Sequence, residues 1–170
     1  MEYELEQKTK GKVSHHRAVF ILKKRDSEQT KNKKKSDDAW IGFFNLSEKG
    51  KEEFEKRMDK WAENGTIPKQ WGHSWDKDEK KGKYTDCFCF KYKKGRVHHR
   101  LYGVYINDPG EPRYRIVLLC TYDKKTQNET DFSKLDKAHK TAELPEVLKC
   151  VSEFFKSRKN KVNSKKHQRR

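Results

Sequence analysis

Two adjacent histidines, His98 and His99, stand immediately before Arg100 in a stretch where basic side chains are concentrated. Between Lys91 and Lys125 the sequence has nine lysines and arginines but only three acidic residues. Imidazole accepts and donates protons near neutral pH, and guanidinium and ammonium groups stabilise the negative charge of a phosphate. These residue types therefore suit cleavage of RNA by internal transesterification, in which a 2′-hydroxyl attacks the neighbouring phosphate and no metal is required.

Alternation along an extended strand assigns these side chains to faces. It puts His98 and Arg100 on one face of the strand and His99 on the other. We expect the nearby basic residues to form one cationic groove with both imidazoles at its edge. The residues expected to bind RNA in this groove are Lys91, Lys93, Arg96, Lys124 and Lys125.

Two other interpretations of these residues stay open. In a structural interpretation, Arg100 is a strand residue paired with an acid and the lysines are solvated strand ends. In a metal interpretation, the Cys-x-Cys pair joins the histidines, although zinc sites usually separate paired cysteines by two or more residues. We therefore predict neither a metal ion nor a cofactor, and expect four buried free thiols, at Cys87, Cys89, Cys120 and Cys150.

Three apolar segments are expected to hold the site: Tyr84–Lys93, Val97–Ile106 and Arg113–Tyr122. Lys-Gly and Asn-Asp-Pro-Gly-Glu-Pro separate them, and both sequences are typical of turns. The segments therefore predict an antiparallel meander. The third is apolar on both faces at its centre and should be the most buried strand.

Helical spacing of apolar residues appears on both sides of the meander. Ser47 and Gly65 bracket a predicted amphipathic helix, which a further strand at Trp40–Leu46 precedes. Trp71 and Trp75 are expected to pack over the core rather than to stack on nucleic-acid bases. After the meander, helical patterns run from Phe132 to Ala142 and from Pro145 to Phe155. The predicted fold class is α+β, with helices packed on the meander.

Charge divides the chain into three parts. With 31% hydrophobic and 40% charged residues, a core along all 170 residues is not expected. Residues 8–35 hold 11 basic and 2 acidic side chains, and residues 156–170 hold 8 basic and no acidic ones. We predict a basic arm at 1–36 with one short strand at Arg17–Leu22, a folded domain at 37–155, and a basic disordered tail at 156–170. The arms either bind polyanions or keep the protein in solution.

Hydropathy gives no sign of a membrane span. No run of about 18 apolar residues occurs, and the acidic start, Met1–Glu6, differs from the basic start of a secretory signal. We expect a cytoplasmic protein that does not contact a membrane.

The segment RLYGVYINDPGEPRYRIVLLCTYDKKTQNETDFSKLDKAHK, Arg100 to Lys140, resembles the RelE/HigB-like toxin superfamily, especially its phage-associated branch. The family also has an arginine opening one strand, an Ile-Val-Leu-Leu-like core in the next, and a Lys-Lys-Thr-Gln turn before a helix. Pattern-level similarity extends from Trp40 to Ala142. The resemblance implies a microbial-RNase-like fold that cleaves messenger RNA, commonly on the ribosome, and a cognate antitoxin that covers the site.

The resemblance also implies roles for individual residues. Arg100 matches the strand arginine that contacts the scissile phosphate, and Lys124 and Lys125 match the basic pair after the last strand. Lys91 and Lys93 match the basic residues of the preceding strand. Tyr122 is a candidate for the acid or base near the sheet's end, whereas His98 and His99 have no fixed counterpart. The predicted catalytic residues are thus Arg100, His98, His99 and Tyr122.

The sequence is also consistent with two other functions. One is a non-catalytic nucleic-acid-binding accessory protein of phage or mobile-element origin, which would use the same basic surfaces. The other is a toxin-family inhibitor of a protein target, because some relatives inhibit gyrase. Fold resemblance alone does not decide the reaction.

Overall fold

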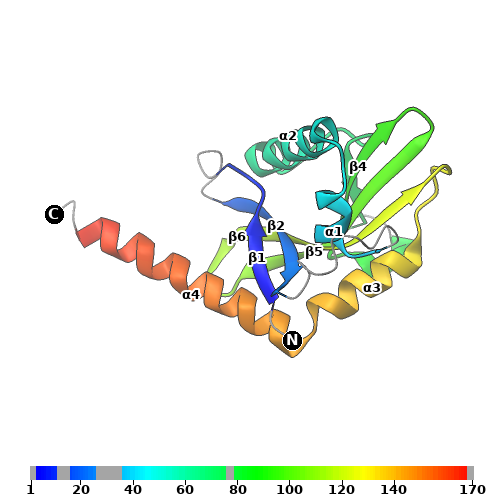
Figure 1. Cartoon of the computed structure of the whole chain (residues 1–170). Coiled ribbons are helices and arrows are strands. Elements are labelled where there is room, and N and C mark those ends of the chain that lie inside the picture. Colours follow the sequence, from blue (N-terminus) through cyan, green and yellow to red (C-terminus); the bar gives the residue numbers. More distant parts are fainter. Residues whose placement is uncertain (1–2, 11–15, 26–35, 76–78, 168–170) are drawn as a thin grey trace.

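The sheet at the centre of the molecule has six strands in the order β1-β2-β6-β5-β4-β3 (Figure 1). It is seen in a computed structural model that describes residues 3–10, 16–25, 36–75 and 79–167. Helices α1 and α2 lie on one face, and α3 and α4 lie on the other. The α+β class is confirmed.

The predicted meander is present, with its second and third strands longer than expected and its first strand shorter, beginning at Cys87 instead of Tyr84. Strands β4 (Cys87–Lys94), β5 (Val97–Asp108) and β6 (Glu111–Lys125) pair antiparallel in sequence order. Gly95 turns β4 into β5 with a φ of 59°, in the left-handed region that a residue without Cβ adopts readily. In β6 the six consecutive residues 116–121 are buried, and β5 has an equal run at 99–104, so β6 is not distinguished as the most buried strand.

The folded part begins well before residue 37. The strand expected at Arg17–Leu22 is present as β2 (Arg17–Lys24), and it pairs parallel to β6, so the sheet is mixed rather than purely antiparallel. Strand β1 (Tyr3–Gln7) pairs with β2 and had not been predicted. It is held in part by Glu6, whose carboxylate accepts a 2.9 Å hydrogen bond from the Trp40 indole. The rest of the predicted arm, residues 11–15 and 26–35, lies outside the described residues.

The strand predicted at Trp40–Leu46 is wrong, because this segment forms helix α1 (Ala39–Phe44). Asp38 explains the helix: its carboxylate accepts hydrogen bonds from the backbone N–H groups of Trp40 and Ile41. Such a cap satisfies donors that an extended segment would not present together. The buried face of α1 packs against β6 and β2.

The amphipathic helix is confirmed as α2 (Glu48–Asn64) with both expected ends. The Ser47 hydroxyl accepts from the Gly50 N–H, and Gly65 ends the helix at φ 74°. Its apolar side chains, including Phe54, Met58 and Trp61, pack on the sheet with α1.

On the other face, α3 (Phe132–Ala142) and α4 (Pro145–His167) confirm the two later helices. Helix α4 continues through the basic segment that was expected to be disordered, and projects beyond the sheet (Figure 1). That segment contains no proline or glycine, and Arg158 anchors it with a 2.6 Å ion pair to Glu111 and a position 3.5 Å from the Tyr114 ring. Residues 168–170 lie outside the described part.

Two short elements complete the edge beside β4. Strand β3 (Gly72–Ser74) pairs with β4, and the 3-10 helix η2 (Glu79–Tyr84) leads into β4. Trp75 is buried in the α3–α4 core, as predicted, while Trp71 is only partly buried. Within the described ranges no helix is both long and apolar enough to cross a membrane.

The close contact of α1 with the Tyr122 ring depends on Gly42. A Cβ at this position would overlap the ring atoms of Tyr122. We expect Gly42→Ala to lower the free energy of unfolding by about 1–3 kcal/mol, as overpacking does. Helix propensity alone favours alanine by about 1 kcal/mol. A net decrease in the free energy of unfolding, measured by urea denaturation, would therefore show that the contact with Tyr122 outweighs helix propensity.

Gly82→Ala is the matched control, because a Cβ at Gly82 meets nothing within 4 Å. Its free energy of unfolding should stay within about 0.5–1 kcal/mol of the parent. Equal values for the two variants would contradict the tight packing of α1 on Tyr122.

Candidate functional site

The register of β5 with its neighbours divides the predicted site residues between the two faces of the sheet. His99 pairs with Lys124, His98 with Lys125, and Arg100 with Asp123. Directly opposed residues of an antiparallel pair share a face. His98, Arg100 and Lys125 therefore lie on the α3 side, whereas His99, Tyr122 and Lys124 lie on the α1 side. The expected single groove is wrong, and two hollows take its place.

The first hollow, here called the Tyr122 hollow, has a volume of about 430 Å³ on the α1 side. Its polar wall combines strand ends with the turn between α1 and α2. No carboxylate is among the described residues that line it. The lining side chains that bear on chemistry are Asn45, Tyr92, Lys94, His99, Tyr122 and Lys124.

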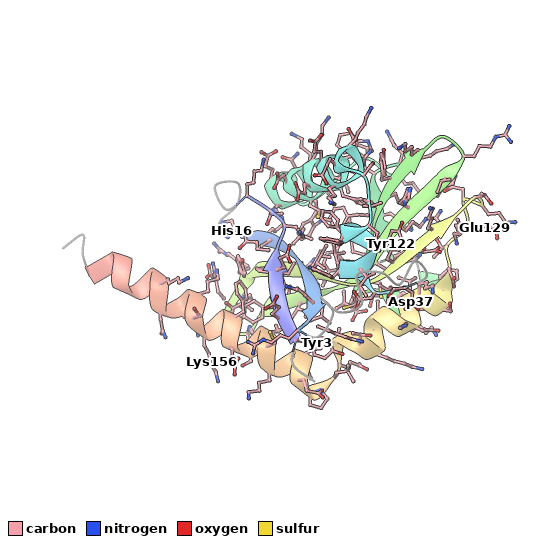
Figure 2. The ribbon with its side chains drawn as sticks, viewed as in Figure 1. Tyr3, His16, Asp37, Tyr122, Glu129 and Lys156 are labelled. Atoms are coloured by element: carbon pink, nitrogen blue, oxygen red, sulfur yellow. The ribbon has the colours of Figure 1, made fainter. Side chains whose placement is uncertain are left out.

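A hydrogen-bonded pair lies in this hollow. His99 Nδ1 is 2.6 Å from the Tyr122 hydroxyl, and the Tyr92 ring stacks on the imidazole with centroids 5.7 Å apart. His99 is 8% exposed, and Tyr122 is the more accessible member. Figure 2 shows Tyr122 beside α1. The pair therefore joins an open hydroxyl to a largely buried imidazole.

The environment shifts both groups toward their neutral forms. Burial lowers the pKa of His99, and the positive charges of Lys124 and Lys94 lower it further. Burial, followed by the negative charge of Asp123, raises the pKa of Tyr122 to about 12. At neutral pH, a neutral imidazole thus faces a protonated phenol, which is an arrangement that can pass a proton along.

The second hollow, here called the Lys91 hollow, has a volume of about 310 Å³ along β4. It shares His99 and Tyr92 with the Tyr122 hollow. The charged and polar side chains particular to it are Arg57, Gln70, Lys91, Lys93, His98, Arg100 and Asn128. No carboxylate lines it within the described part of the chain, so both hollows favour anions.

Arg100 is less accessible than its predicted role requires. The side chain is 2% exposed, and its guanidinium donates to the Asn128 side chain at 2.8 Å and to the Glu129 carbonyl oxygen at 2.5 Å. Both acceptors belong to the β6–α3 connection, where Figure 2 labels Glu129. Arg100 therefore holds this connection against the sheet and reaches the Lys91 hollow only from its base.

The predicted lysines and Arg96 occupy different environments. Lys124 lines the Tyr122 hollow, whereas Lys125 lies 3.2 Å from Asp123 on the other face and lines neither hollow. Lys93 and Arg96 are exposed near the β4–β5 turn. Lys91 lies deeper, and burial lowers its pKa. His98 is part-exposed among lysines and Arg100, and its pKa is also lowered, first by loss of solvent and then by these charges.

Sequence reasoning missed Lys94 and Arg57, and it assigned Trp71, which lines the Lys91 hollow, to the core. Arg57 lies between two rings, 5.2 Å from Trp71 and 5.5 Å from Tyr92, and forms a 2.8 Å ion pair with Glu53. Lys94 had been assigned to the turn alone. Helical spacing puts Arg57 near Trp61 on the buried side of α2. This spacing could have identified Arg57 as a residue that packs toward the sheet.

The cysteines do not join the histidines. All four cysteines are free thiols, and Cys87, Cys89 and Cys120 are buried as predicted, whereas Cys150 is only partly buried. Burial raises the pKa of Cys87 and of Cys89 to about 12, so both stay protonated. Among the described residues, no group of three histidine, cysteine or acidic side chains is arranged to hold a metal ion.

Comparison of the chain with protein-family models, with curated proteins and with solved structures finds no match.

Titration of His99 tests the electrostatics of the Tyr122 hollow. We expect the imidazole midpoint, followed by NMR, to lie below the ordinary 6.5. Lys124→Gln should move the midpoint back toward 6.5. It removes the positive charge that most strongly disfavours protonation of the imidazole, while burial remains. Lys140→Gln, on the exposed surface of α3, should leave it in place. A midpoint at or above 6.5 in the parent protein would refute this description of the hollow.

Proposed function

We propose that the protein binds RNA at the β4–β5–β6 end of the sheet and cleaves it without a metal ion. The observation that carries this proposal is the His99–Tyr122 pair, held at 2.6 Å in a hollow whose described charged side chains are all basic. A proton-transfer pair beside lysines meets the needs of 2′-hydroxyl transesterification.

The charge and shape of the surface favour a polyanion over a neutral or cationic substrate. The chain carries a net charge of +16, and the two hollows add aromatic faces to their cations, notably Tyr92 and Trp71. Bases of single-stranded RNA stack on such faces, while phosphates bind the ammonium and guanidinium groups. A flexible single strand can follow both hollows around the β4 edge.

The reaction can be written with the residues of the Tyr122 hollow. The Tyr122 oxygen accepts the proton of the attacking 2′-hydroxyl as the phenol passes its own proton to His99 Nδ1. The ammonium groups of Lys94 and Lys124 stabilise the pentacoordinate phosphorane. One of them protonates the departing 5′-oxygen, and proton transfer from the imidazolium restores the starting state. The products are a 2′,3′-cyclic phosphate and a 5′-hydroxyl.

The Lys91 hollow serves as the binding surface for the flanking strand. Lys91, Lys93 and His98 face it, and Arg96 extends from the nearby turn. In this proposal Arg100 is a positioning residue, because its hydrogen bonds fix Asn128 at the edge of the hollow. Lys125, paired with Asp123, contributes to the general positive field.

The RelE/HigB-like resemblance supports the same reaction class. The meander, the Lys-Lys-Thr-Gln turn and the following helix occur in the order that the family pattern implies. On this basis we propose messenger RNA as the substrate, the ribosome as the setting, and an antitoxin that covers the hollows in the cytoplasm. Helix α1 departs from the family pattern, which expects a strand there.

A second candidate is RNA binding without cleavage. It is favoured by the burial of Arg100, since the family assigns the phosphate contact to this arginine and here its guanidinium is bound to the β6–α3 connection. The two candidates share the binding surface and differ only in whether RNA is cut.

Cleavage assays separate the two candidates. In the presence of EDTA, we expect the protein to cut single-stranded RNA and leave 2′,3′-cyclic phosphate ends. Tyr122→Phe should reduce the rate by about 10²–10⁴-fold, the usual contribution of a proton-transfer group, with RNA affinity nearly unchanged.

Tyr84→Phe is the matched control, because the Tyr84 hydroxyl is bonded to Asp136 and lines neither hollow. It should cut RNA at the parent rate. If the parent protein binds RNA but leaves it intact, the non-catalytic candidate is correct.

Salt dependence tests the binding surface independently of cleavage. Lys94→Gln combined with Lys124→Gln should lower the slope of log affinity against log salt by about 1.4, at about 0.7 for each phosphate contact with a single strand. Binding is measured with a 2′-deoxy oligonucleotide, which cannot react. Lys140→Gln combined with Lys149→Gln makes the same charge change on exposed helix surfaces. If this control lowers the salt slope equally, the RNA phosphates do not bind specifically at Lys94 and Lys124.

A further inference from the structure

A third hollow lies on the same face of the sheet as the Tyr122 hollow, near the other end of α2. This Arg113 hollow has a volume of about 560 Å³. Ser47, which precedes α2, lines the Tyr122 hollow, whereas Gly65, which follows α2, lines the Arg113 hollow. A helix of 17 residues is about 25 Å long, so one nucleotide cannot occupy both.

Four basic side chains line the Arg113 hollow: Arg17, Lys69, Arg113 and Arg115. No carboxylate is present in its lining as the structure describes it. Arg17 and Arg115 are register neighbours in the parallel pair of β2 and β6. The described lining is therefore basic, which favours an anionic ligand.

Contacts with neutral groups orient Arg115 at this surface. Its Nε donates to the Asn107 side chain at 2.8 Å, and its guanidinium carbon is 4.8 Å from the centre of the Tyr105 ring. Neither contact neutralises its charge. The guanidinium that lines the hollow is therefore fixed in position and keeps its positive charge. Both properties favour binding of a phosphate.

Aromatic rings form the other wall. Tyr105 stacks on Trp61, with centroids 6.0 Å apart and planes 27° apart, and the Phe88 ring lies 5.5 Å from Tyr105. The Trp61 side chain is 1% exposed, and its indole Nε1 has no hydrogen-bond acceptor within the described structure. The buried Trp61 ring therefore supports the Tyr105 ring, which is the more exposed aromatic surface of this wall.

We propose that the Arg113 hollow binds a nucleoside phosphate. The phosphate contacts Arg113, Arg115 and Lys69, and the base packs against the Tyr105 wall. The volume lies in the range of small-ligand sites, and cations beside an aromatic face match the two halves of a nucleotide. This inference is independent of cleavage at the Tyr122 hollow. The ligand is either a free mononucleotide or one nucleotide unit of an RNA chain.

The test is an NMR titration of the full chain with four probes: AMP, adenosine, inorganic phosphate and a tetraribonucleotide. The Trp61 indole N–H reports on the hollow. We expect saturable shifts of this signal with AMP or the tetranucleotide, at affinities about tenfold or more above those for adenosine and phosphate. A response to AMP identifies a free nucleotide as sufficient, and a response to the tetranucleotide alone identifies an RNA chain.

Lys69→Glu combined with Arg113→Glu should weaken binding of the responding probe by about tenfold or more. Lys140→Glu combined with Lys149→Glu is the matched control and should stay within about twofold. Thermal melting checks folding. If the first pair melts early, Lys69→Gln with Arg113→Gln gives the same comparison with a smaller charge change.

Three results would overturn the inference: no saturable shift of Trp61 with AMP or the tetranucleotide, binding of phosphate or adenosine as tight as that of AMP, or unchanged binding in the folded double variant. The proposed cleavage is read separately, since RNA cutting should persist in the Lys69 and Arg113 variants and slow by about 10²–10⁴-fold in Tyr122→Phe. The two proposals can therefore fail independently.

Discussion

The strict alternation of side chains along β5 is the constraint on which the rest of the structure depends. Leu101 packs with the α1–α2 core and Tyr102 with the α3–α4 core, so both faces of the strand are buried. A shift of one residue would exchange the two sets, and the register is therefore fixed. Where the helices no longer cover the strand, the same alternation sends His99 and Arg100 to opposite faces.

Because the site residues are divided in this way, each face of the sheet has a different role in the proposed function. On the α1 side, burial and nearby lysines keep His99 neutral beside the Tyr122 hydroxyl, which suits proton transfer. On the α3 side, Arg100 secures the β6–α3 connection, and the proposed contact with RNA falls to more accessible cations such as Lys93. Basic side chains recur in the Arg113 hollow and along α4, so positive charge is distributed over the molecule in separate, locally ordered groups.

Much of the fold could be predicted from local patterns, whereas the site depended on long-range register. Ser47 and Gly65 marked α2 correctly because capping is a local interaction. The prediction of a strand at Trp40 was wrong because an apolar run of this length fits a strand as well as a short helix. The hydrogen bonds of the Asp38 cap favour the helix. The separation of Lys124 from Lys125, and the burial of Arg100 by Asn128, follow from pairing partners that spacing alone does not reveal.

The most direct measurement is a structure of the protein bound to a single-stranded RNA in which the attacking 2′-hydroxyl is absent. We expect a backbone phosphate within hydrogen-bonding distance of Lys124 and the Tyr122 hydroxyl, with the adjoining nucleotides along the Lys91 hollow. A complex in which RNA phosphates contact only α4 or the Lys91 hollow, and none enters the Tyr122 hollow, would contradict the proposal.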